Sequence, residues 1–80
     1  MTLVELTEMI VKSLVSDPDS ISVKEFPSYD EIIIEVVVKE EDMGSVIGRE
    51  GKIANSIRTV VQASSYLKDN KRVKINISSF

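Results

Sequence analysis

The sequence predicts a single α+β domain, spanning residues 1–80, with a three-stranded mixed sheet and three helices on one face. Two segments carry apolar residues at helical spacing, three are β-branched or alternate in polarity, and a glycine-rich stretch precedes the longest helical segment. A content of 42% apolar and 29% charged residues is typical of globular chains, and the length suits one domain.

The first expected element is a helix over residues 3–15. Thr2 and Glu5 have the spacing of a capping box, and leucine and isoleucine then recur at helical spacing up to residue 14. The helix is expected to stop before Asp17 and Pro18, because proline disfavours helical geometry in the residue ahead of it.

Two strands are expected next, paired antiparallel. Residues 21–26 alternate in polarity, and residues 27–30, Pro-Ser-Tyr-Asp, supply turn chemistry. Residues 31–38 are β-branched at six of eight positions, which is the strongest strand signal in the chain. Ile33 and Val37 make the second face of this segment apolar as well, which predicts a central strand.

The second half is expected to contain a helical turn over residues 43–47, a helix from residue 52 to about 66, and a strand over residues 72–78. The long helix would place Ile53, Ile57, Val60, Val61 and Ser64 on one face. A strand reached through a helical connection is usually parallel to the preceding one. The acidic run at residues 40–42 is better explained as favouring and capping a helix N-terminus than as a magnesium site.

Charge divides the chain into two parts. Before Gly48 there are three cations against eleven carboxylates, whereas from Gly48 onward there are seven cations against two carboxylates. The net charge of −3 therefore hides a basic second half, and such asymmetry points to a polyanion partner or to solvated faces.

Composition argues against an enzyme. The chain has no cysteine and no histidine, which removes disulfides, thiolate metal sites and the commonest general base. We expect no catalytic residues, no metal site and no cofactor. The sequence also lacks a membrane-spanning segment and a signal-peptide layout, which predicts a cytoplasmic protein without a membrane partner.

The most informative feature is the pair Gly48 and Gly51, which brackets Arg49 and Glu50 just before a long helix. Missing side chains allow close approach to the main chain, and amides at a helix start suit a phosphate. A Walker loop or a dinucleotide fingerprint would need glycine at Val46, so neither fits.

Residues 46–58 read Val-Ile-Gly-Arg-Glu-Gly-Lys-Ile-Ala-Asn-Ser-Ile-Arg. This stretch resembles the KH signature, in which an Ile-Gly-x-x-Gly loop joins two helices. The element order α-β-β-α-α-β is similar to the type II KH fold, and the resemblance covers essentially the whole chain. Length, lone domain and the stretches at residues 57–61 and 71–75 resemble the small bacterial single-KH RNA-binding proteins of the KhpA family.

The resemblance implies a clamp on about four nucleotides of single-stranded RNA by the loop, with bases in a groove lined by aliphatic side chains. Arg49 and Lys52 would be the main cationic contacts, whereas Arg58 would either contribute or face away from the loop. Isoleucines 47, 53 and 57 suit either the groove or the core. Ser45 and Glu50 depart from the basic residues that relatives often carry there. The implied RNA-binding residues are Gly48, Arg49, Glu50, Gly51, Lys52, Ile47, Ile53 and Arg58.

The family resemblance also implies a post-transcriptional regulator or RNA chaperone that acts with a partner, with a link to cell-shape regulation. Relatives are associated with self-pairing and with partnering larger Jag-like proteins that contain a KH domain. The alternative hypothesis is a KH-fold protein-interaction or dimerisation module with weak or no RNA binding, which the acidic net charge and Glu50 would suit.

Overall fold

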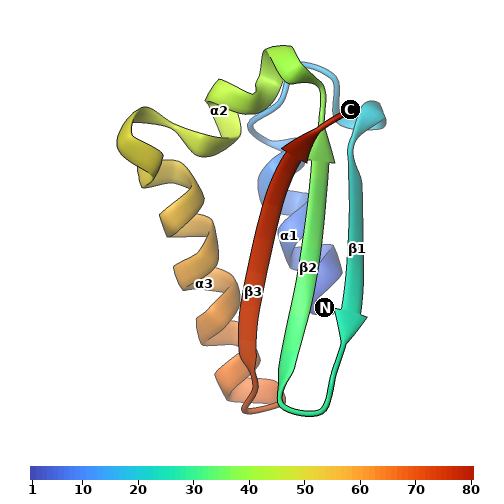
Figure 1. Ribbon diagram of the computed structural model, residues 1–80, viewed down its shortest axis with the longest axis vertical. Helices are drawn as coiled ribbons and strands as arrows, with labels where there is room; N and C mark the ends of the chain where they lie inside the picture. Colours follow the sequence, from blue (N-terminus) through green and yellow to red (C-terminus); the bar gives the residue numbers. More distant parts are fainter.

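The computed structural model describes residues 1–80 and confirms the α+β fold with a three-stranded mixed sheet. All three helices lie on one side of the sheet (Figure 1). No helix is both long enough and apolar enough to cross a bilayer. The elements are α1 Leu3–Lys12, β1 Ser22–Pro27, β2 Glu31–Val38, α2 Met43–Ile47, α3 Lys52–Lys68 and β3 Arg72–Ser79.

Strand β2 is the centre of the sheet, as its sequence predicts. It pairs antiparallel with β1, where Lys24 lies opposite Glu35, and parallel with β3, where Ile34 lies opposite Ile75. Its residues 32, 34, 36 and 38 are buried under the helices, whereas the alternate positions are only partly covered. Val36 and Val38, together with Ile34, are fully buried and form the centre of the core.

Helix α1 begins as predicted and ends earlier than predicted. Thr2 Oγ1 accepts a hydrogen bond from the Glu5 amide at 3.1 Å, and Glu5 accepts one from the Thr2 amide at 2.8 Å, which completes the capping box. The predicted end at residue 15 was wrong, because the helix stops at Lys12. There the Ser13 amide is shared between the Met9 and Ile10 carbonyls, and the Leu14 amide donates to the Val11 carbonyl, three residues back. Ser13 Oγ also donates to the Met9 carbonyl, so the last turn tightens.

Helix α3 buries a stripe that shares Ile57 and Val61 with the predicted one but is shifted around the helix. Its buried residues are Ala54, Ile57, Val61 and Ser65, while Val60 is 49% exposed. The shift arises because α3 packs against both α1 and β3, so the line that faces the core lies between these two neighbours. The apolar residues at its edge are left beside solvent.

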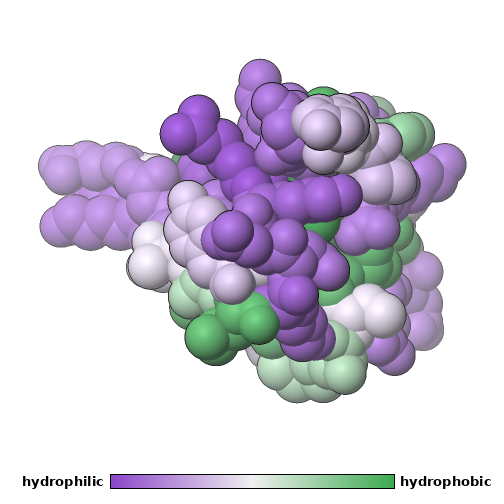
Figure 2. Space-filling view, turned by 90° about the horizontal axis from the view of Figure 1, so that it is seen from below, coloured by the Kyte–Doolittle hydropathy of each residue, from purple (hydrophilic) through white to green (hydrophobic).

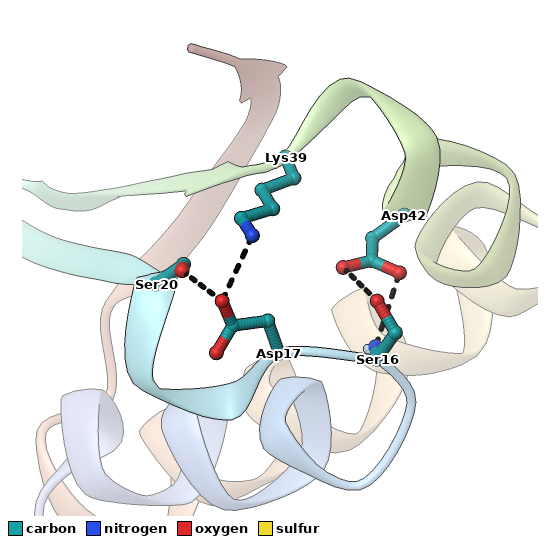
Figure 3. Close-up of polar contacts among 5 residues, drawn as sticks. All are labelled: Ser16, Asp17, Ser20, Lys39 and Asp42. Atoms are coloured by element: carbon teal, nitrogen blue, oxygen red, sulfur yellow. Dashed lines mark hydrogen bonds and ion pairs between the residues drawn. The ribbon is translucent and has the colours of Figure 1, made fainter.

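Hydrogen bonds and an ion pair join the connection after α1 to the segment before α2 (Figure 3). Asp42 is only 4% exposed and accepts hydrogen bonds from the Ser16 amide and hydroxyl, both at 3.0 Å. The prediction that the acidic run caps its own helix was therefore wrong for Asp42, whose side chain makes no capping bond to α2. No group of three or more carboxylates is assembled that could hold a metal ion.

A second pair of contacts lies beside the first. Asp17 accepts a hydrogen bond from Ser20 and lies 2.9 Å from Lys39 Nζ (Figure 3). The Ser20 hydroxyl, followed by the Lys39 ammonium, lowers the pKa of the Asp17 carboxyl, and Asp17 in turn raises the pKa of Lys39. Together these two sets of contacts join the connection after α1 to the segment that follows β2.

Candidate nucleic-acid interface

The loop between α2 and α3 is built from an unusual sequence of backbone conformations. Gly48 ends α2 with φ 75° and ψ 175°, a region that is essentially restricted to glycine. Glu50 (φ 57°, ψ 24°) and Gly51 (φ 75°, ψ 12°) then adopt left-handed conformations. These angles reverse the chain between two helices and hold the loop away from the sheet, at the upper left of Figure 1.

The two glycines are required for different reasons. A Cβ atom added to Gly48 would lie 2.6 Å from Ile53 Cγ1 and 2.9 Å from Ile53 Cβ, so this main chain has space only for hydrogen. A Cβ on Gly51 would meet only the Asn55 side-chain nitrogen, at 4.0 Å, and so faces open space. Ile53 therefore supports the loop from beneath, and Gly51 leaves its outer surface bare.

The sequence predicted that the main-chain amides at the start of the long helix would be free to bind a phosphate, and some of them are already hydrogen-bonded within the protein. The Gly51 amide donates to the Gly48 carbonyl at 3.2 Å, and the Lys52 amide donates to the Arg49 carbonyl. No helical turn spans Gly48, so the amides of Arg49 and Glu50 have no helical acceptor. The N–H groups left for a ligand therefore lie at the loop tip, ahead of the first turn of α3.

The cations of the loop are not neutralised by the protein itself. Arg49 and Lys52 are exposed, and neither forms an ion pair. The two ion pairs in the chain, Lys12 with Glu8 and Lys39 with Asp17, use cations of the first half. In Figure 2 hydrophilic side chains stand out from the body at the left, where Figure 1 places the loop. Glu50 is exposed on the same loop and reduces its positive charge.

The structure places the predicted site residues on two sides of α3. Ile53 and Lys52 face α1, where they line an apolar groove of about 510 Å³. Arg58 lies on the β3 side, because its guanidinium donates to Asn55 Oδ1 at 3.2 Å and to the Ile75 carbonyl at 3.3 Å. It therefore faces a different neighbour from Lys52. Ile47, at the end of α2, is half-buried.

The groove between α1 and α3 is lined mainly by apolar residues, seven of nine. Met9 is 50% exposed there, opposite the exposed Val60. Ile57, considered above for an RNA groove, forms part of its floor and is buried in the core. The other apolar lining residues are Leu6, Ile10, Leu14 and Ile53.

Sequence reasoning missed the polar residues on the β3 side of α3. Asn55 Oδ1 accepts the hydrogen bond from Arg58. Gln62 bonds the main chain at the start of β3, accepting from the Val73 amide at 2.8 Å and donating to the Lys71 carbonyl at 3.0 Å. The available signal was their spacing, because residues 51, 55, 58, 62 and 66 recur every three or four positions and so share one helix face.

A sheet in the order β1-β2-β3, with two helices joined by a Gly-x-x-Gly loop ahead of the last strand, is the type II KH arrangement. The family described as KhpA/KhpB, KH domain, matches residues 4–77. The chain belongs to this family.

Relatives from several bacteria support the assignment, and each is named RNA-binding protein KhpA. The protein of Clostridium perfringens is 49% identical over 73 residues, covering 91% of this chain and 96% of its own length. That of Caldanaerobacter subterraneus has the same identity and coverage. The protein of Borreliella burgdorferi is 40% identical over 74 residues, covering 92% of this chain and 89% of its own.

Solved structures with the same fold include a domain of a larger protein. A crystal structure of Aquifex aeolicus Era matches 98% of this chain with a TM-score of 0.74 at 19% identity. A crystal structure of Era in complex with MgGDPNP and a segment of 16S ribosomal RNA matches 96% with a TM-score of 0.70, also at 19% identity. The chain spans only 30% and 29% of these Era chains, and at this identity the likeness establishes the fold alone.

Proposed function

We propose that this chain binds single-stranded RNA, holding about four nucleotides of backbone against the loop from Gly48 to Gly51. The observation that carries the proposal is an exposed turn with a bare glycine and two unpaired cations, at the start of the longest helix. Relatives at 40–49% identity over nearly the full length are named RNA-binding proteins. In this proposal the chain acts in the cytoplasm, as a post-transcriptional regulator or RNA chaperone together with a partner.

The proposed mechanism separates positioning from base recognition. The phosphates would approach the loop tip, where the Arg49 and Glu50 amides have no helical acceptor and Gly51 offers no steric barrier. Arg49 and Lys52 would contribute charge but carry no sequence information, because phosphates are common to all nucleotides. No bond is made or broken, so we expect no nuclease or nucleotidase activity in the presence of magnesium.

The test is the double change Arg49→Asp and Glu50→Asp, with RNA binding measured by fluorescence anisotropy on a short uridine oligonucleotide. Loss of the loop cation should weaken binding by roughly 10- to 150-fold, since a hydrogen bond to a charged group contributes roughly 1.5–3 kcal/mol. About three phosphate contacts predict a slope of about −2 for log K against log salt, and the double variant should have a shallower slope.

Lys74→Glu is the matched control, because it changes the net charge by the same amount from an exposed position on β3. It should reduce affinity far less than the loop variant. If the folded loop variant bound RNA as tightly as the original chain, the loop would not be the binding site and the proposal would be wrong.

The apolar groove favours a second candidate function, which is pairing with another copy of this chain. Met9 and Val60 leave hydrophobic surface in water on facing helices, and burying such surface is the usual driving force for association. A larger Jag-like KH-containing protein would use the same chemistry as a partner. Self-pairing would also supplement the small core of a chain of this length.

Sedimentation equilibrium tests this candidate with Val60→Asp, which places a charge in the groove. The variant should sediment as a monomer at concentrations where the original chain pairs, with its RNA binding by the loop retained. Thr59→Asp is the control, since Thr59 is exposed on the same helix outside the groove. An original chain that is monomeric at high concentration would exclude self-pairing, and a chain that pairs without binding RNA would favour the interaction module.

A further inference from the structure

The surface between α3 and β3 contains a second hollow, of about 440 Å³, that the loop does not use. It differs from the apolar groove in its chemistry, because half of its lining side chains are polar or charged. It also differs in position, since it faces the last strand instead of α1. The hollow is lined by Arg58, Thr59, Gln62, Ala63, Tyr66 and Val73.

The floor of this hollow is rigid. The Gln62 amide bonds the main chain at both ends, accepting from Val73 in β3 and donating to Lys71 just before it. Ser65 Oγ donates to the same Lys71 carbonyl at 2.7 Å. Arg58 is tied to the Ile75 carbonyl, which holds the guanidinium against the strand. These bonds fix the shape of the hollow without a ligand, so a ligand would not have to order it.

One aromatic ring is available at this surface. Tyr66 lines the hollow and is 54% exposed, so part of its ring is accessible to a ligand. The remaining aromatics lie elsewhere, with Phe26 and Tyr29 in the β1–β2 hairpin and Phe80 at the C-terminus. A nucleobase stacks on tyrosine rings and on guanidinium planes, and both groups line this hollow.

The hollow lies on a face of α3 that begins at the loop. Gly51, Asn55, Arg58, Gln62 and Tyr66 follow one face of α3, and this stripe runs roughly 22 Å along the helix at 1.5 Å per residue. From residue 52 to residue 71 the chain carries four cations and one carboxylate, so the path is electrostatically favourable for a polyanion. Arg72 and Lys74 are not counted, because they alternate with the buried Ile75 and lie on the other face of β3.

We infer that RNA longer than the loop segment continues along the α3–β3 surface and stacks one base on Tyr66 beside Arg58. This inference rests on the proposed function of the loop. It assigns the chain a longer RNA ligand than the loop alone would hold, and it gives an aromatic contact to a loop that lacks one. Stacking makes this contact tolerant of base identity, because every base has a flat face.

The experiment uses the tyrosine content of the chain. There are two tyrosines and no tryptophan, so Tyr29→Phe leaves Tyr66 as the only tyrosine emitter. In that background an oligouridine of about four nucleotides should leave the emission nearly unchanged, whereas one of roughly twice that length should quench it. The longer RNA should also bind more tightly than the shorter one.

Tyr66→Ala should weaken binding of the longer RNA by about tenfold, to the level of the shorter RNA, and leave the shorter one unaffected. Tyr66→Phe should retain the tight binding, because the ring remains. Tyr29→Ala is the matched control, since Tyr29 is 99% exposed and lines neither the hollow nor the apolar groove.

The outcomes separate this inference from the proposed function. If Tyr66→Ala binds both RNAs as the original chain does while the loop double variant binds neither, the extended path is wrong and the loop proposal stands. If the loop double variant binds both RNAs normally, the proposed function itself fails. If Tyr66→Ala changes self-association and not RNA affinity, the hollow is a protein contact and the inference is overturned.

Discussion

Replacing Gly48 by alanine should be one of the most destabilising single-methyl additions in this chain. At φ 75° and ψ 175° a non-glycine residue costs about 1–3 kcal/mol, and overpacking against Ile53 adds about 1–3 kcal/mol. Alanine also restricts the unfolded chain more than glycine does, which offsets about 0.4–1 kcal/mol of this destabilisation. We expect a net loss of about 3 kcal/mol, which lowers Tm by roughly 12–24 °C in a domain of this size.

Urea denaturation followed by far-UV circular dichroism measures this loss, with Gly51→Ala as the matched control. Gly51 has the same φ and open space around it, so its alanine variant should lose only about 1 kcal/mol. Adding Ile53→Ala should reduce the cost of Gly48→Ala by about 1 kcal/mol, since Ile53 Cγ1 and Cδ1 would be removed. Equal losses for the two glycine variants would refute the reasoning from the Ile53 contact.

Three further changes test other parts of the fold. Asp42→Ala leaves the Ser16 amide without its acceptor and should lower the free energy of unfolding by about 1.5–3 kcal/mol, measured by urea denaturation. Asp42→Asn keeps an acceptor and should lower it less. Ile34→Ala in the fully buried centre should cost about 2–5 kcal/mol and Ile34→Val about 0.5–1.5 kcal/mol, and similar costs would contradict the packing. Because the folded state lowers the pKa of Asp17, its stabilisation is present above the ordinary value of 3.8 and is lost as the pH falls through the folded pKa. The stability difference between the original chain and Asp17→Asn should therefore be constant near neutrality and shrink in acid, and Lys39→Met should reduce it.

Features that depend on neighbouring residues in the sequence could be predicted. The capping box at Thr2 and the β-branched strand from Glu31 both lie where the pattern places them, because each signal is local and strong. The antiparallel and parallel pairings followed from the lengths of the connections. The loop conformation was predictable only in part, because glycine suits the positive φ of Gly48 and Gly51, whereas Glu50 adopts a positive φ that its residue type does not indicate.

Features that depend on tertiary partners could not be predicted. Asp42 stands in an acidic run typical of a helix start, and only the approach of residue 16, across 26 positions of sequence, makes it an acceptor for that backbone. Val60 was expected on the buried face and is exposed, whereas Ser65 was not named and is buried, because α3 packs against α1, α2 and β3 at once. Arg58 lies on a different side of α3 from Lys52 for a similar reason, because it bonds the β3 backbone at Ile75.

The acidic net charge does not contradict RNA binding once distances are considered. The molecule extends over 34 × 24 × 19 Å, whereas charges in water are screened beyond about 8 Å at physiological ionic strength. A phosphate at the loop therefore responds to nearby charges and much less to the whole chain. Among those charges Arg49 and Lys52 are free of ion pairs, while Lys12 and Lys39 of the first half are paired with carboxylates. The fold thus leaves both cations of the glycine loop unpaired and exposed, where a phosphate can meet them.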